Sequence, residues 1–147
     1  MKASSPVKSV PKNNHNKQSL APQIQAIVEL IQHDSRILAA YLLGSVSRST
    51  ARNDSDIDIA VLPDPACRFS GMDILELNAR FDECAPFPAD VGVLSTDNLI
   101  YAKEAVLRGT CVYIRDKGYH DLFAATVLGL YVALRAERKE IENAYTA

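Results

Sequence analysis

Two short polar motifs lie close together in the chain, each beside an apolar run. Gly44 and Ser45 follow the run 37–43, and Asp56 and Asp58 come ten residues later, where a second apolar run begins. Both runs have the length and the Ile, Leu, Val and Tyr content of buried strands. Because side chains two positions apart on a strand point the same way, Asp56 and Asp58 are expected to share one face.

The residue types of these motifs suit the chemistry of a triphosphate and a metal ion. Neighbouring carboxylates repel each other unless a cation lies between them, and hard oxygen ligands suit Mg²⁺. Gly44 lacks a Cβ, so the backbone there can turn sharply or approach a ligand closely. The Ser45 hydroxyl and the nearby N–H groups can face an anion. Either motif alone also fits an ordinary turn or a strand edge, but together they indicate phosphoryl or nucleotidyl transfer.

A third carboxylate usually completes the metal shell in two-metal nucleotidyl transfer, and it can accept the proton of the attacking hydroxyl. Asp90 is the best candidate, because it opens the short apolar run 90–94, which is expected to form a strand beside the first two. The alternative for Asp90 is an acid that only caps a turn. Asp54 and Asp64 are weaker candidates, since one lies in a turn and the other between two prolines.

The composition favours a single domain in the cytoplasm. A chain of 147 residues with 48% hydrophobic residues can bury a proper core. The three cysteines are odd in number and lack zinc-ligand spacing, which fits free thiols in a reducing compartment. No apolar run approaches the ~18–20 residues of a membrane span, and the N-terminus lacks an apolar signal core.

Charge is divided unevenly along the chain. The first 22 residues hold four lysines and no acid, so the remainder carries a net charge of -6. We expect residues 1–21 to form a flexible basic tail and residues 22–147 to form the folded domain. An acidic body argues against direct nucleic-acid binding.

Apolar periodicity predicts an α/β fold, with a small mixed β-sheet and helices on one side of it. The expected strands are short and apolar: 37–43, 56–62, 90–94 and 110–114. The expected helices cover 22–33, 72–84, 95–108 and 121 onward. Leu75 and Ala79 are expected to face inward from the second helix. The charged end of the last helix, 135–142, has little core left to cover, and we expect it to lie near a partner.

These motifs resemble those of the DNA polymerase β-type nucleotidyltransferase superfamily. More narrowly, the stretches 42–48 and 53–62, together with the chain length, resemble the minimal nucleotidyltransferase (MNT) antitoxins that pair with HEPN-domain toxins. The C-terminal stretch 131–141 is also similar to that group. The likeness covers about residues 22–145 and implies the minimal nucleotidyltransferase fold, with its small mixed sheet flanked by helices and a long C-terminal helix.

The resemblance implies a protein adenylyltransferase that acts as an antitoxin. Such a protein would use ATP and two Mg²⁺ ions to transfer AMP to a tyrosine hydroxyl of a HEPN RNase toxin, which would block the RNase. The implied metal ligands and catalytic acids are Asp56, Asp58 and Asp90, and the implied nucleotide-binding residues are Gly44, Ser45 and Arg48. A solvated loop position is the alternative for Arg48.

The chain departs from the family pattern without losing the three acids. Ser49 stands where a glycine is common, Leu94 where a second acid is common, and Gly92 where a larger apolar residue is common. Two other interpretations stay open. One is an antitoxin that acts only by covering its toxin, and the other is a small-molecule nucleotidyltransferase of the aminoglycoside-modifying type.

Overall fold

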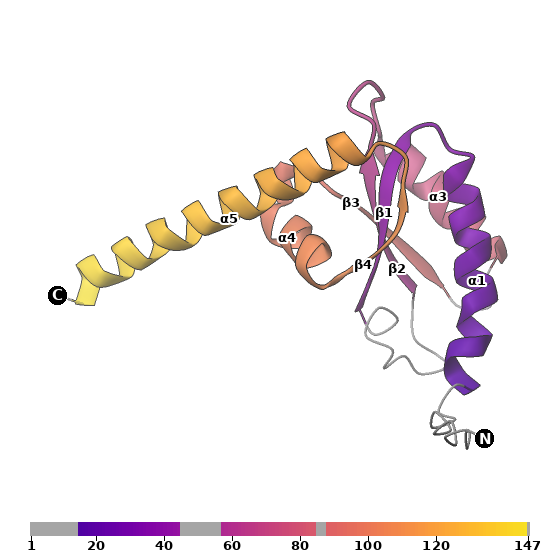
Figure 1. Cartoon of the computed structure of the whole chain (residues 1–147), viewed down its shortest axis with the longest axis horizontal. Helices are drawn as coiled ribbons and strands as arrows, with labels where there is room; N and C mark the ends of the chain where they lie inside the picture. The colour runs from indigo at the N-terminus through magenta and orange to yellow at the C-terminus, as the bar shows by residue number, and fades with distance from the viewer. Residues whose placement is uncertain (1–14, 45–56, 85–87, 147) are drawn as a thin grey trace, which may run out of the picture.

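The computed structural model describes residues 15–44, 57–84 and 88–146. Within them, a four-stranded mixed sheet has the order β3-β2-β1-β4. The central strand β1 (Ile37–Leu43) pairs antiparallel with β2 (Ile57–Pro63) and with β4 (Thr110–Ile114). The edge strand β3 (Ala89–Val93) runs parallel to β2. The small mixed sheet expected from the sequence is confirmed (Figure 1).

Helices cover both faces of this sheet, with α1 (His15–Gln32) and α3 (Gly71–Cys84) on one face (Figure 1). The short helix η1 (Thr96–Asn98), α4 (Leu99–Arg108) and α5 (Lys117–Thr146) lie on the other side. The expectation of helices on one side is wrong. Six consecutive residues of β1 are buried, and alternate side chains of a strand point to opposite faces, so both faces need a cover.

The inward side of α3 also differs from the predicted one. Leu75 is 62% exposed and Ala79 is exposed, whereas Leu77 and Phe81 are fully buried against the sheet. Ile74 continues the buried stripe, because residues three and four apart lie on one side of a helix. Leu75 and Ala79 are four residues apart as well, so spacing alone did not decide which side faces the sheet.

Two helices begin earlier than predicted. α1 begins at His15, so Pro22 lies inside the helix and not in its first turn; proline removes only one N–H from the helical ladder. α5 begins at Lys117 because the Asp116 carboxylate accepts the Tyr119 N–H at 3.0 Å and caps the first turn. None of the helices in the described part of the chain has the length and apolar character needed to cross a bilayer.

Arg36, directly before β1, links the sheet to α3. Its guanidinium donates to the Asp34 carboxylate at 2.6 and 2.8 Å and to Asp73 at 2.7 Å, and it lies 5.5 Å from the centre of the Phe69 ring. The Asp34 side chain is only 7% exposed. The hydrogen bonds from Arg36 therefore lower the pKa of Asp34 below its ordinary value, against the opposing effect of burial.

We expect Arg36→Met to lower the free energy of unfolding by about 1–3 kcal/mol at neutral pH, because hydrogen bonds to charged groups are lost. A carboxyl with a lowered pKa in the folded protein stabilises above its ordinary pKa of about 3.9. That stabilisation disappears as pH falls through the lowered value. Urea unfolding should therefore show wild type and variant converging as the pH approaches about 2.

Arg108→Met is the matched control, because Arg108 pairs with Glu104 at 3.5 Å on the surface of α4, away from the Arg36 cluster. Its effect should stay below about 0.5 kcal/mol at every pH. An equal effect of the two substitutions would show that the Arg36 cluster adds nothing beyond surface charge.

Candidate functional site

Two of the predicted acids lie side by side in the sheet. Asp58 on β2 and Asp90 on β3 are register partners in the parallel pair. Adjacent strands are about 4.8 Å apart, and register partners point to the same face. Asp90 is exposed and Asp58 is half-buried, so both carboxylates are within reach of a ligand. The predicted position of Asp90, on a strand next to the strand of Asp58, is confirmed.

Gly44 brings the backbone against the Asp58 carboxylate. It follows Leu43, the register partner of Asp58, and has a φ of 70°. This left-handed conformation favours glycine over residues with a Cβ. A Cβ at Gly44 would lie 2.9 Å from an Asp58 carboxylate oxygen. The predicted turn therefore starts directly beside the carboxylate pair.

The remaining predicted residues are not all part of this arrangement. Asp56, Ser45 and Arg48 lie outside the described residues, as does Asp54. Asp64 lies at the opposite end of β2 from Asp58, where its carboxylate pairs with Arg115 at 2.7 Å. Asp64 therefore holds two segments together, and it is not a third acid of the site.

A pocket of about 370 Å³ opens over the two carboxylates. The described residues that line it are Leu43, Asp58, Asp90, Gly92, Val93, Asn98 and Tyr101. They offer carboxylate, amide and phenol oxygens, and none of these lining residues is a lysine or arginine. This donor set fits Mg²⁺, which prefers oxygen ligands and would offset the repulsion between the two acids.

Tyr101 is a residue of the pocket that the sequence analysis missed. Its hydroxyl lies over Gly92, where a Cβ would come within 2.0 Å of the Tyr101 oxygen. Burial, together with the negative charges of Asp58 and Asp90, raises the pKa of Tyr101 to about 12. The phenol therefore stays protonated at neutral pH and can donate a hydrogen bond inside the pocket. Gly92 was the available signal, because a glycine within a strand often marks the close approach of another group.

We expect Gly92→Ala to displace the Tyr101 ring and to lower the free energy of unfolding by about 1–3 kcal/mol, the usual cost of overpacking. Removing the ring in Gly92→Ala/Tyr101→Ala should relieve the clash. The two substitutions should therefore be non-additive by about 0.5–3 kcal/mol in a double-mutant cycle of urea unfolding.

Gly129→Ala controls for the loss of a glycine, since a Cβ at this helical position meets nothing within 4 Å. It should stabilise the protein by up to about 1 kcal/mol through helix propensity. Additive effects of the substitutions at Gly92 and Tyr101 would mean that the two residues do not pack against each other as described.

A mixed sheet with paired acids beside a glycine turn is the architecture of a nucleotidyltransferase. The family described as "Polymerase beta, Nucleotidyltransferase" matches residues 25–118, and the chain belongs to this family. The match includes β1, β2, β3, η1 and α4, which together supply every described residue that lines the pocket.

One relative and one solved structure are more specific than the family match. The chain is 28% identical over 116 residues to the protein adenylyltransferase MntA of Shewanella oneidensis, and the match spans 78% of this chain and 81% of that relative. It is also similar to a chain of a toxin–antitoxin crystal structure with AMP-PNP, with a TM-score of 0.67 and 26% identity over 85% of this chain and 97% of that one.

A third likeness shows the shared fold. It is to one chain of a structure described as a tri-AMPylated Shewanella oneidensis HEPN toxin in complex with MNT antitoxin, with a TM-score of 0.62 and 24% identity. The match covers 85% of this chain and 99% of the other. The minimal nucleotidyltransferase fold expected from the sequence is thus confirmed.

Proposed function

We propose that this chain is a protein adenylyltransferase that acts as an antitoxin. It transfers AMP from ATP to a tyrosine hydroxyl of a partner HEPN RNase and so blocks the RNase. The observation that carries the proposal is the pairing of Asp58 with Asp90 beside the Gly44 turn. Support comes from the similarity to a protein named an adenylyltransferase and to a toxin–antitoxin structure with AMP-PNP.

Each residue of the site has a role in this proposal. Asp58 and Asp90, with Asp56 from the same motif, would hold Mg²⁺. When bound, Mg²⁺ neutralises charge on the phosphates and polarises the α-phosphate. The backbone at Gly44 approaches the triphosphate closely, and Ser45 and Arg48 contact its oxygens. Asp56, Ser45 and Arg48 lie outside the described residues, and their proposed roles follow from the sequence motif.

The proposed reaction exchanges one bond at the α-phosphorus of ATP for another. The tyrosine oxygen of the partner forms a bond to the α-phosphorus of ATP, and the bond from that phosphorus to the bridging oxygen breaks. Pyrophosphate leaves with the bond electrons. Asp90 accepts the proton of the tyrosine hydroxyl, since it is the exposed acid of the pair. The Tyr101 hydroxyl belongs to the same pocket and can donate a hydrogen bond there.

The proposed reaction also fits a protein of the cytoplasm, because ATP, Mg²⁺ and the HEPN RNase would be present there together. Cys67, Cys84 and Cys111 are all free thiols, as a reducing compartment would keep them.

Intact-mass spectrometry of the partner tests the proposal directly. After incubation of the chain with its HEPN partner and Mg²⁺–ATP, the partner should gain the mass of one or more AMP groups. Excess EDTA should prevent the gain, because the carboxylate pair binds the nucleotide through Mg²⁺. An unchanged partner mass, or transfer that continues in excess EDTA, would contradict the proposed reaction.

A further inference from the structure

The outer half of α5 extends away from the body of the protein (Figure 1). Val127 is the last fully buried residue of the helix, and Tyr131 and Leu134 are half-buried. All of residues 135–146 are exposed, including Ile141 at 50% and Tyr145 at 88%. The body of the protein therefore leaves the side chains of this segment open to a partner.

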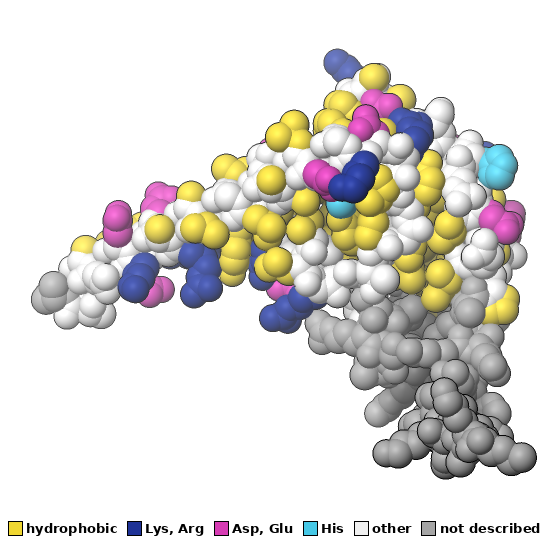
Figure 2. Space-filling view, in the orientation of Figure 1, with side chains coloured by type: hydrophobic (Ala, Val, Ile, Leu, Met, Phe, Trp, Pro, Cys, Tyr) yellow, Lys and Arg dark blue, Asp and Glu magenta, His cyan; other side chains and the backbone are white. Residues whose placement is uncertain are grey.

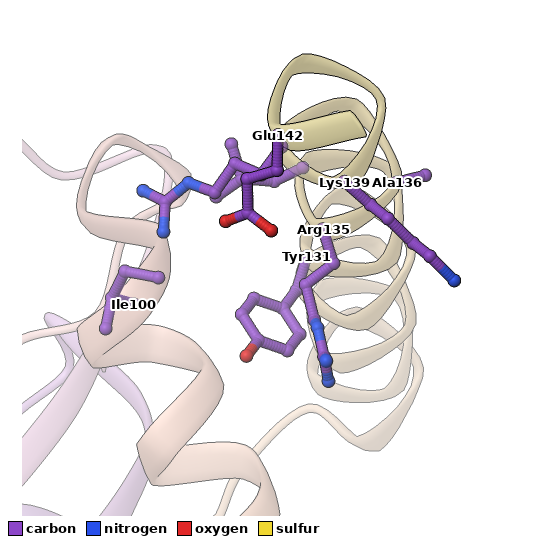
Figure 3. Close-up of a pocket in the computed structure, with 8 residues that line it drawn as sticks. Ile100, Tyr131, Arg135, Ala136, Lys139 and Glu142 are labelled. Carbon is purple, nitrogen blue, oxygen red and sulfur yellow. The ribbon is translucent and has the colours of Figure 1, made fainter. Parts of the chain in front are cut away.

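A groove of about 570 Å³ lies between this extended helix and α4. Its walls are Ile100 of α4 and seven residues of α5: Tyr131, Leu134, Arg135, Ala136, Arg138, Lys139 and Glu142. Figure 3 shows Ile100 facing Tyr131 and Glu142 across the gap, while Lys139 points away from it. The groove therefore has apolar side chains on both walls and charged side chains along α5.

The charges of the groove are mainly positive. Arg135 and Arg138 outnumber the single lining acid, Glu142, even without Lys139, whose side chain points away. Lys and Arg side chains gather along the lower edge of the projecting helix (Figure 2). At the inner end, the Lys103 ammonium lies 4.6 Å from the centre of the Tyr131 ring. Lys103 already pairs with Glu104 at 2.6 Å. The cations that complement an acidic partner are therefore Arg135 and Arg138, although the folded body as a whole is acidic.

The groove and the carboxylate pocket both border the first turn of α4. Ile100 lines the groove, and its neighbour Tyr101 lines the pocket, so the first turn of α4 separates the two. An α-helix is about 10 Å across. A partner segment in the groove would therefore need only a few extended residues to cross this turn and reach Asp90.

We infer that the α4–α5 groove holds an acidic, partly apolar segment of the protein that accepts AMP, and that it guides the acceptor tyrosine to Asp90. The inference rests on the proposed function and names how that site selects its substrate. An RNA occupant is less suited to the groove, because a phosphate backbone is bound mainly by cations, whereas this groove also has the apolar side chains of Ile100 and Leu134.

Charge reversal on the α5 wall tests the inference. We expect Arg135→Glu/Arg138→Glu to raise KM for the HEPN partner by about tenfold or more, since like charges then face the acidic segment. The affinity for Mg²⁺–AMP-PNP, measured by calorimetry without partner, should not change. Ile100→Glu places an acid on the opposite wall and should also raise KM. Both variants replace exposed residues, and their melting temperatures should stay close to that of wild type.

Arg80→Glu/Lys117→Glu is the matched control, because it makes the same change in net charge at two exposed ion pairs away from the groove. Its KM for the partner should match that of wild type. A KM unchanged in the groove variants, while wild type transfers AMP, would overturn the inference and leave the proposed function standing. An absence of transfer by wild type would overturn both.

Two further outcomes would assign the groove to another occupant and so contradict the inference. One is binding of single-stranded RNA by wild type that is lost in Arg135→Glu/Arg138→Glu. The other is a dimer of this chain, seen by analytical ultracentrifugation, that the same variant dissociates.

Discussion

Asp58→Asn and Asp90→Asn are each expected to reduce AMP transfer by about 10²- to 10⁴-fold. A bound metal supplies several kcal/mol of transition-state stabilisation, and each variant removes one of its ligands. Without Mg²⁺, both variants should unfold at the same urea concentration as wild type or at a higher one, because the repulsion between neighbouring carboxylates is relieved. Transfer rates and urea unfolding midpoints measure the two effects separately.

Asp64→Asn is the control for these variants, since Asp64 follows the same strand and pairs with Arg115. It should lose a little stability and keep full transfer activity. If Asp58→Asn or Asp90→Asn instead unfolded at a clearly lower urea concentration than wild type, the acids would serve the fold, and the loss of activity would not identify metal ligands.

The sheet and the position of the acid pair could be predicted because the signals were local and strong. The apolar runs that became β1 and β2 are buried almost throughout, and β3 is buried at Ala89 and Val91. Since Asp90 begins such a run after a helix, a right-handed crossover places it beside β2. The pairing of Asp58 with Asp90 is the result.

What the sequence could not predict depends on contacts between distant segments. Leu75 and Leu77 are both apolar residues of one helix, and only packing against the sheet decides that Leu77 is buried. The position of Tyr101 depends on the angle of α4 to β3, which no local pattern specifies. Gly92 looked like a departure from the family, and the structure shows that it makes room for Tyr101.

Inactivation of the toxin is expected to outlast the antitoxin. A phosphodiester between AMP and a tyrosine oxygen is covalent, so it does not dissociate when the antitoxin is removed. An antitoxin that only covers its partner acts by mass action and protects no more toxin than it can bind. Toxin incubated with sub-stoichiometric antitoxin and Mg²⁺–ATP should therefore lose most of its RNA cleavage, and the loss should remain after the antitoxin is stripped away.

Three parallel reactions make this result specific to catalysis. Omission of ATP, addition of EDTA and use of Asp90→Asn should each leave the stripped toxin fully active, since each prevents AMP transfer without removing the binding surface. The mass of the inactive toxin should show the added AMP. Full recovery of cleavage after stripping, with an unchanged toxin mass, would instead assign neutralisation to binding alone. In that case the carboxylate pair beside Gly44 would have no part in protecting RNA, and the α4–α5 groove would act only as a contact surface.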